Sequence, residues 1–554
     1  MQAPMKDTAP DGFAAAIVRR VLTLRSLRLL LAAGVLLAPL PGRAQLADAW
    51  LHTSPFDSDL RPFSARLAAM GGLEISVVDP QNRIDAYRYS DNPAGLYADT
   101  DSSQLEQYSR YDQERQLYFG ERHSAERRGS GVRSVVQHGS GWTLGIDGEY
   151  GSFNASQHDL FPGPDEGRFI RDFDLMYPND LLGVSGDRTI SASVEAPRLG
   201  LTYSRPLIRA LVIGMRFGYA SESETPHGTP EQYTIQHDLT AYQLTGGALY
   251  DLRAGLLRTT VGGHIGYSSD KVEGTNESPL NQDSYDWSRP LVYYGGQAVI
   301  RYGTWVHGII DGRHRSYDGE GIARVNWAPQ FYLNPLPADN HDYNIFKREW
   351  SAFLSGLRRN EGSTRWLVDI KGTPAHVSAS YLTYREYEWL RPNALVITVV
   401  RDLDVRRTGH EIAGGVSVDL PENRGLLAAE VHVVRGRRED FTRALGDSLR
   451  DIRPETISYH FGAEYRPVAW LPLRAGLVAL RDDPDRLEGS VQKRPHTPPV
   501  KGTRLTAGFG YDWAWIGTHL DVAWAHEHLS GAPGSLSGEI RSGDTIAIAA
   551  RYLF

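Results

Sequence analysis

The chain ends in DTIAIAARYLF, a stretch in which two kinds of side chain alternate. Counting back from the last residue in steps of two gives an apolar and aromatic set: Phe554, Tyr552, Ala550, Ile548 and Ile546. The intervening set is mostly small or polar: Leu553, Arg551, Ala549, Ala547 and Thr545. Because successive side chains of a β-strand point to opposite faces, this pattern predicts a strand with one apolar face.

The same alternation recurs upstream, in Ile457–Tyr465, Thr503–Trp513 and His519–His526. A soluble sheet with one wet face also alternates, so a single strand decides little. Repetition over many segments of ~10 residues is typical of transmembrane β-barrels, where one face contacts lipid and the other a wet lumen. The terminal aromatic resembles the signal that closes outer-membrane barrels. This resemblance implies that the barrel-assembly machinery is a partner, recognising Phe554 and the alternate residues before it.

The connections between these segments alternate in length. Tight links at 421–425, 466–470 and 514–517 alternate with long polar stretches at 482–501 and 528–543. Short turns on the periplasmic side and long loops outside are the outer-membrane arrangement. With the last residue at the periplasmic end, we expect Trp470, Trp513 and Trp515 near that interface, where indole rings tend to anchor.

These features predict an all-β fold, a transmembrane antiparallel β-barrel over residues 104–554. We expect ~16 strands, within a range of about 14 to 18, with an even total. Further candidate strands are Thr143–Gly151, Arg198–Arg205, Ala210–Ala220, Thr240–Leu252, Thr259–Tyr267, Val292–Tyr302, Trp366–Lys371, Val377–Tyr384, Ile412–Val418 and Leu427–Arg435. Gly319–Phe346 is open as either a loop or another strand.

Residues 1–44 are predicted to be a secretory signal peptide. Four arginines between residues 19 and 28 precede the apolar run Leu29–Leu40, and Gly42-Arg43-Ala44 offers small residues for cleavage after Ala44. The alternative, a membrane anchor, is disfavoured because a spanning helix needs ~20 apolar residues. Cysteine is absent, which excludes a lipoprotein anchor. The expected location is the outer membrane of a Gram-negative bacterium, with its lipids and lipopolysaccharide as partners.

Between this signal and the first strand lies an irregular segment, residues 45–103, that contains SDNPAGLYAD. Pro93 fixes its own φ and restricts Asn92, while Gly95 permits a sharp return of the chain. The Asn92 side chain can bond nearby backbone groups, which would make a compact, self-capped knot. We predict a plug inside the lumen. An ordinary loop outside the barrel is the alternative.

The run NPAGLY, placed between a signal and a barrel, resembles the hatch of the FadL-type family, the long-chain fatty acid transporters of outer membranes. The resemblance assigns the hatch triplet to Asn92, Pro93 and Ala94, with Gly95 beside it. It implies a passive channel for uptake of hydrophobic, fatty-acid-like small molecules. This chain departs from the family pattern in being longer. A secretion or assembly barrel, a structural barrel and a general porin are the alternative interpretations.

One pair of residues raises the question of catalysis. His376 and Ser378, two apart on a predicted strand, resemble the arrangement of outer-membrane lipases and deacylases, where a histidine activates a serine. The spacing places no acid beside them. We therefore interpret both as polar residues of the lumen and expect no enzyme.

Two further groups could bind a metal ion. The segment from Asp159 to Asp187 contains Asp165, Glu166, Asp172, Asp174 and Asp180, whose oxygens suit a hard divalent cation but lack a fixed spacing. His526-Glu527-His528 lacks the i, i+4 histidine pair of a zinc helix and is interpreted as part of the barrel rim. The sequence predicts no metal and no cofactor. A formal net charge of −8 gives no reason to expect nucleic acid as a partner.

Overall fold

The structure is a computed structural model. It describes residues 64–77, 92–99, 103–118, 121–138, 141–159, 188–228, 233–277, 281–327, 347–392, 403–441, 448–488, 500–530 and 540–553. All of these belong to one compact unit, Arg43–Leu553. The predicted signal peptide, the five acidic residues between 165 and 180, and Phe554 lie outside the described residues.

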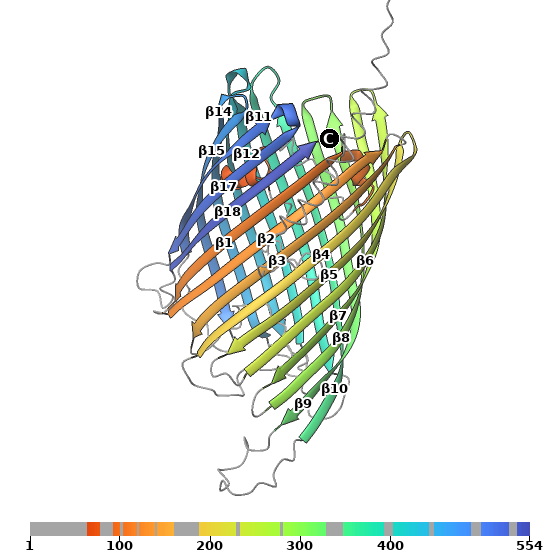
Figure 1. The fold of residues 1–554 in the computed structure, drawn as a ribbon, viewed down its shortest axis with the longest axis vertical. Coiled ribbons are helices and arrows are strands. Elements are labelled where there is room, and N and C mark those ends of the chain that lie inside the picture. Colours follow the sequence, from red (N-terminus) through yellow and green to blue (C-terminus); the bar gives the residue numbers. More distant parts are fainter. Residues whose placement is uncertain are drawn as a thin grey trace, which may run out of the picture. The chain divides into compact units, whose positions relative to one another are not determined.

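The described residues form eighteen antiparallel strands that close on themselves, because β1 pairs with β2 on one side and with β18 on the other (Figure 1). The predicted all-β, closed antiparallel barrel is therefore confirmed, and its first strand begins at Gln104. The eighteen strands exceed the central expectation of about 16 and lie at the upper end of the expected range.

The first nine strands are β1 (Gln104–Tyr118), β2 (Glu121–His138), β3 (Trp142–Asp159), β4 (Arg188–Ile208), β5 (Leu211–Gly228), β6 (Tyr233–Ala254), β7 (Leu257–Glu277), β8 (Asn281–Tyr302) and β9 (Val306–Trp327). The other nine are β10 (Lys347–Asp369), β11 (Ala375–Pro392), β12 (Leu403–Asp419), β13 (Gly425–Phe441), β14 (Ser448–Val468), β15 (Leu471–Glu488), β16 (Val500–Trp513), β17 (Thr518–Ser530) and β18 (Ile540–Leu553). Gly319, the first residue of the range that the sequence left open as a loop or a strand, lies in β9.

No candidate range was predicted for β1, β2 or β15, and β9 overlaps the range left open between a loop and a strand. Charged residues occur on both faces of the RDDPDRLE half of β15 and the DGRHRSYDGEG half of β9, which hides the alternation. The cause is length. Described strands run from 13 to 23 residues, whereas ~9–11 residues suffice to cross a bilayer. The remainder of each long strand has no lipid to face.

Short turns follow every even-numbered strand up to β16, and all lie at the same end of the barrel. Two of them contain a 3₁₀ turn, η5 (Pro421–Asn423) and η6 (Ala514–Ile516). In the first, Glu422 and Asn423 adopt positive φ angles of 59° and 55°. The three tight links predicted from sequence are thus confirmed. We call this the short-turn end and the opposite one the loop end.

The two faces of the strands differ as the alternation predicted. On β16, Leu505 and Phe509 are exposed on the outside, whereas Thr506 between them is buried on the lumen side. On β18, Ile546 and Ile548 are exposed and Ala547 is fully buried. Large exposed apolar side chains therefore cover the outer wall, which is the surface a barrel presents to lipid.

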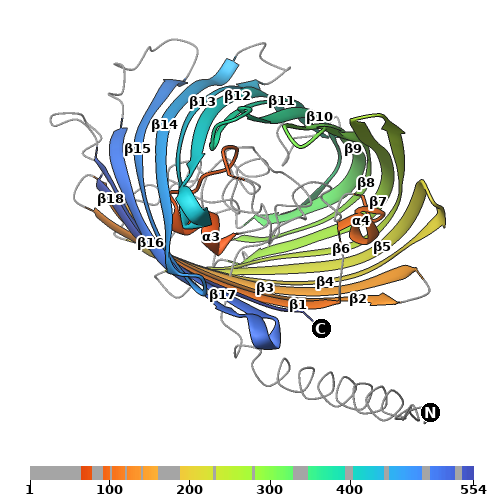
Figure 2. The ribbon, with the colours of Figure 1, turned by 90° about the horizontal axis from the view of Figure 1, so that it is seen from above.

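Two short helices, α3 (Ala65–Ala69) and α4 (Gly95–Asp99), lie inside the ring of strands against different walls (Figure 2). The first contacts β15 to β18 and the second contacts β3 to β5. Among the described residues, no helix is long and apolar enough to cross a membrane.

Candidate functional site

The candidate site is the N-terminal segment inside the lumen, which contacts the wall at two anchors. The first anchor contains Asn92, Pro93 and Ala94. The Asn92 side chain accepts a hydrogen bond from the Ala94 backbone N–H (3.2 Å), and the Asn92 carbonyl accepts one from Gly95 (2.9 Å). The knot thus satisfies its own polar groups, as an Asx turn does. The local bonding expected of Asn92 is present.

The lumen wall receives this knot on three glycines, which we call the glycine seat: Gly214 of β5, Gly247 of β6 and Gly262 of β7. A Cβ on Gly214 would lie 2.4 Å from the Ala94 nitrogen, and one on Gly247 would lie 2.2 Å from Asn92 Oδ1. Real Cβ atoms do not approach this closely. Asn92 also donates from Nδ2 to the Ala248 carbonyl (3.3 Å) and is fully buried.

Apolar contacts complete the first anchor. Ala94 packs with Leu249 and Val299, which lie on β6 and β8. Leu96 packs with Val135, and a Cβ on Gly145 would come within 2.9 Å of its side chain. The anchor therefore combines close backbone contact with a small apolar cluster, and no charged side chain takes part in the described contacts.

The second anchor is residues 64–77, which contact β12 to β18. It begins with Ser64, whose hydroxyl caps α3 by accepting from the Leu67 N–H (3.2 Å). The wall again supplies glycines: Cβ atoms on Gly462, Gly476 and Gly508 would lie 2.4, 2.2 and 2.6 Å from atoms of Met70, Gly71 and Ala69. Ala65 and Ala69 pack on Ala523 and Ala547 of the wall.

At the centre of this anchor the chain turns through Gly71, which has φ of +80°. The Thr506 hydroxyl accepts from the Gly71 N–H and donates to the Ala69 carbonyl, both at 2.9 Å. His460 Nδ1 lies 2.7 Å from the Gly71 carbonyl. The wall thus satisfies backbone groups of a turn that has no regular partner.

Two buried carboxylates of the wall hold the second anchor by charge. Glu464 of β14 accepts from Arg66 of α3 at 2.8 Å and from Arg474 of β15 at 2.8 Å. Burying a charge without a partner is expensive, so removing either arginine would leave Glu464 poorly compensated. The Arg66 pair joins an N-terminal helix to the barrel wall.

The other carboxylate, Glu430 of β13, binds backbone rather than a cation of the segment. Its oxygens accept from the N–H groups of Glu74, Ile75 and Ser76 at 2.7–2.9 Å, and from the Ser76 hydroxyl at 2.5 Å. Hydrogen bonds to an ionised carboxylate are stronger than neutral ones. Ser417 donates to the Ser76 carbonyl (2.7 Å), which fixes the same stretch from β12.

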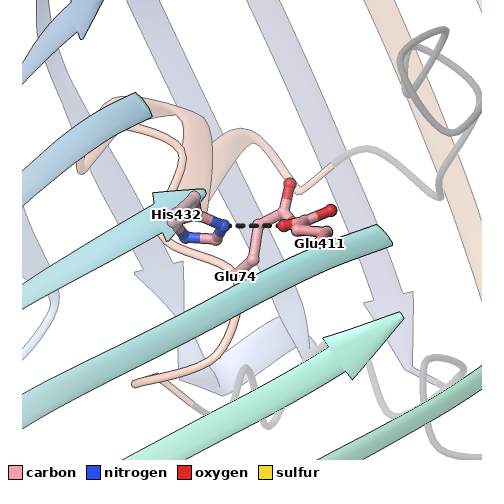
Figure 3. Close-up of side chains that lie close together, drawn as sticks. All are labelled: Glu74, Glu411 and His432. Atoms are coloured by element: carbon pink, nitrogen blue, oxygen red, sulfur yellow. Dashed lines mark hydrogen bonds and ion pairs between the residues drawn. The ribbon is translucent and has the colours of Figure 1, made fainter. Parts of the chain in front are cut away.

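His432 stands behind this carboxylate. Its Nε2 lies 2.9 Å from Glu430 and its Nδ1 lies 2.8 Å from Glu411 of β12. Figure 3 shows His432, Glu411 and Glu74 of the segment close together. Among the described residues, these three form the group that could hold a metal ion, because one ligand atom from each lies within 4.8 Å of the others. Because both ring nitrogens already bond carboxylates, the imidazole serves here as a bridge between Glu411 and Glu430.

The structure corrects one expectation about His376. An acid does lie beside it: Nδ1 is 2.6 Å from Asp369 and Nε2 is 3.0 Å from Asp419. These acids come from the ends of β10 and β12, so spacing on β11 alone could not place them. With both nitrogens bound to carboxylates, the ring is not placed to activate Ser378, whose buried hydroxyl has no hydrogen-bond partner among the described residues. No catalytic relay forms among these residues.

The His526-Glu527-His528 run lies near the end of β17 at the loop end, as a rim position requires. His526 Nδ1 is 3.0 Å from Asp544 of β18. His526 therefore contacts a carboxylate of the neighbouring strand.

The molecule is thus a closed antiparallel β-barrel with an N-terminal segment anchored in its lumen. No family model matches the chain, and no curated protein matches it. Solved structures similar to it include a Pseudomonas aeruginosa FadL homologue (11% identity, 88% of this chain and 98% of that one, TM-score 0.38). The Pseudomonas putida toluene transporter TodX is another (13% identity, 89% and 98%, TM-score 0.32).

The similar structures also include BauA, the ferric preacinetobactin receptor of Acinetobacter baumannii (9% identity, 82% of this chain and 80% of that one, TM-score 0.35).

Proposed function

We propose that the protein is an outer-membrane channel for passive uptake of hydrophobic, fatty-acid-like small molecules, with the N-terminal segment as its hatch. The observation that carries the proposal is the segment itself, which contacts the lumen wall at two anchors on different strands. A general porin conducts through an open lumen and needs no such segment. The exposed apolar outer wall supports placement in a membrane.

The lumen between the first anchor and the loop end supports a hydrophobic ligand. Its wall carries buried apolar and aromatic side chains from β6 to β11: Leu239, Ala241, Leu291, Tyr293, Tyr317, Leu357 and Tyr384. Transfer of a ligand's apolar surface from water to such a wall is favourable by roughly 25 cal/mol per Å². Charged side chains are buried among them: Asp270 is paired in register with Ala241, Glu388 with Leu357, and Arg289 lies over the Trp287 ring at 4.5 Å, so the lining is mixed.

On this proposal, a ligand enters from the loop end, binds the apolar lining and leaves past the hatch. No energy source is required, because the ligand moves down its own gradient. The hatch keeps the lumen closed to ions while a hydrophobic solute passes. For the ligand to leave, the contacts of one anchor with the wall must break. Among the described residues, the first anchor makes fewer hydrogen bonds to the wall than the second, so it is the anchor proposed to open.

The test combines growth and conductance. A deletion strain should grow poorly on long-chain fatty acids or hydrocarbons as sole carbon source, and the purified protein should show little ion conductance in planar bilayers. Open ohmic conductance without a growth defect would identify a general porin instead. A stable co-purifying partner with neither phenotype would identify a secretion or structural barrel.

Location is tested separately. A folded barrel extracted in detergent should migrate differently on gels before and after boiling, and should fractionate with the outer membrane. Recovery in the soluble periplasmic fraction would contradict the proposal whatever the growth result.

A further inference from the structure

The outer surface of β10 to β14 changes from apolar to polar and charged residues along one row of paired residues. Directly paired residues form a row across these strands: Thr364, Tyr381, Ile412, Val433 and Ile457. From this row toward the short-turn end the outer surface is apolar, with exposed residues such as Val377 and Val416. The next row toward the loop end is Gly362, Thr383, His410, Arg435 and Glu455. The apolar belt therefore ends between these two rows.

Beyond that edge, arginines occur on the outside of β10 to β13, from the first row past it, which holds Arg435, to the fifth, which holds Arg391. They form what we call the arginine patch: Arg358, Arg385, Arg391, Arg406, Arg435 and Arg437. All occupy the strand face that carries exposed apolar residues nearer the short-turn end, such as Tyr381 on β11 and Ile412 on β12. The alternate residues Glu386 and Arg407 are buried on the lumen side. The register is continuous there, so the assignment of faces holds along both strands.

The patch carries more positive than negative charge. Four of its arginines pair with carboxylates: Arg358 with Asp318, Arg391 with Asp404, Arg435 with Glu455 and Arg437 with Glu439. Arg406 lies over the Tyr387 ring at 5.9 Å. Arg385 is exposed and has no ion pair among the described residues. Six arginines against four carboxylates leave an excess of two positive charges.

The sector formed by β7 and β8 differs. Beyond the apolar belt, the outer faces of these two strands carry Lys271, whose amine pairs with Glu273 and lies 3.8 Å from Asp286. There the carboxylates outnumber the cation. The described outer faces of β7 and β8 therefore lack the excess of positive charge found on β10 to β13.

We infer that the arginine patch binds the phosphate groups of phosphorylated glycolipids in the outer leaflet of the membrane. The inference rests on the proposed outer-membrane orientation, with the loop end outside. In that orientation the rows of the patch nearest the belt, which hold Arg435, Arg385 and Arg437, lie at headgroup level, continuous with the apolar surface that acyl chains would cover. Guanidinium groups match phosphate in bidentate geometry, and basic residues beside a membrane attract anionic headgroups.

The experiment measures binding of bisphosphorylated lipid A to the folded, detergent-solubilised full chain by native mass spectrometry. The test variant is Arg385→Gln with Arg406→Gln. We expect its apparent Kd to rise about 30-fold, since each basic residue near the headgroups contributes about a fivefold effect. The control variant is Arg205→Gln with Arg209→Gln, which removes two exposed basic residues at the short-turn end, where β4 leads into β5. Its Kd should stay close to that of the wild type.

The arms of the experiment separate the sources of binding. Lipid A without phosphates should bind the wild type and the test variant with similar affinity. Excess inorganic phosphate should not displace bisphosphorylated lipid A from the wild type. Displacement by inorganic phosphate would show a free-anion site. Equal Kd values for wild type and test variant, or equal losses in test and control variants, would overturn the inference.

Folding and transport are read out independently. Each variant is first shown to be heat-modifiable on gels. Should the double variant fail to fold, Arg385→Gln alone is used, with an expected rise of about fivefold. Fatty-acid uptake by the test variant separates the two proposals: lost lipid A binding with normal uptake supports the patch alone. Normal lipid A binding by a protein that transports nothing would support the arginine patch as a lipid A site and contradict the proposed channel function.

Discussion

Gly246 and Gly247 are neighbours on β6 that face opposite sides of the wall. A Cβ on Gly247 would lie 2.2 Å from Asn92 Oδ1, whereas one on Gly246 would meet nothing within 4 Å. Gly246 pairs with Met215 and Ile265, both exposed on the outer surface. One substitution made at these two positions thus separates contact with the knot from any general effect on the strand.

We expect Gly247→Val to displace the first anchor, because overpacking a close contact typically costs ~1–3 kcal/mol. Bilayer recordings should show higher conductance than the wild type. Gly246→Val, with the same loss of glycine from the same strand, should conduct like the wild type. Matching conductance of the two variants, with both barrels folded, would show that the glycine seat does not hold the lumen closed.

At the scale of residues, the local hydrogen bonding of the first anchor could be predicted from the sequence, whereas its contact with the wall could not. The bond from Ala94 to Asn92 is local, so turn chemistry could predict it. The glycine seat comes from three strands whose register is set by pairing across the sheet, and no local pattern reveals that Gly214, Gly247 and Gly262 meet. A signal did exist, since each glycine occupies a lumen-facing position of an alternating strand.

At the scale of elements, the second anchor depends on one carboxylate that holds three consecutive backbone N–H groups. Glu430→Gln would keep the shape of the side chain but remove its charge and one acceptor oxygen. Hydrogen bonds to charged groups contribute ~1.5–3 kcal/mol each, so we expect residues 74–76 to open more readily. Amide hydrogen exchange at Glu74, Ile75 and Ser76 should accelerate by about tenfold or more.

The matched control is Glu361→Gln. Glu361 of β10 is a carboxylate of the wall that pairs with Arg313 and Arg359 and makes no described contact with the N-terminal segment. This substitution should leave exchange at residues 74–76 unchanged. Unaltered exchange in Glu430→Gln as well would mean that the carboxylate does not secure the segment.

The elements themselves were predictable where lipid and lumen impose opposite chemistry on the two faces. The strands β16, β17 and β18 alternate over most of their described length, and their predicted ranges lie within or close to the observed ones. Prediction failed for β9 and β15, whose halves nearer the loop end face water on the outside as well. The role of Glu430 was also hidden, because a lumen carboxylate in sequence is equally compatible with a wet, unattached side chain.

For the whole molecule, the decisive question is whether the barrel and its N-terminal segment are separable. Every described strand pairs on both sides with another strand, and β1 closes the ring with β18. The described residues of the segment add contacts to the inner wall and contribute no strand. A barrel needs consistent pairing around its ring, which the strands supply without the segment.

We therefore expect deletion of residues 46–97 to leave a folded, heat-modifiable barrel with higher bilayer conductance and greater sensitivity of cells to bulky hydrophobic antibiotics. Asn92→Ala should act in the same direction but less strongly, because it removes the local bond to Ala94 and the bond to Ala248 while the second anchor remains. Pro93→Ala should also act more weakly, since it only relaxes the backbone of the knot. Conductance is compared among the wild type, the deletion and the two point variants. Equal values in all four folded proteins would mean that the segment is not a gate, and the assignment of Asn92, Pro93, Ala94 and Gly95 to a hatch would fail with it.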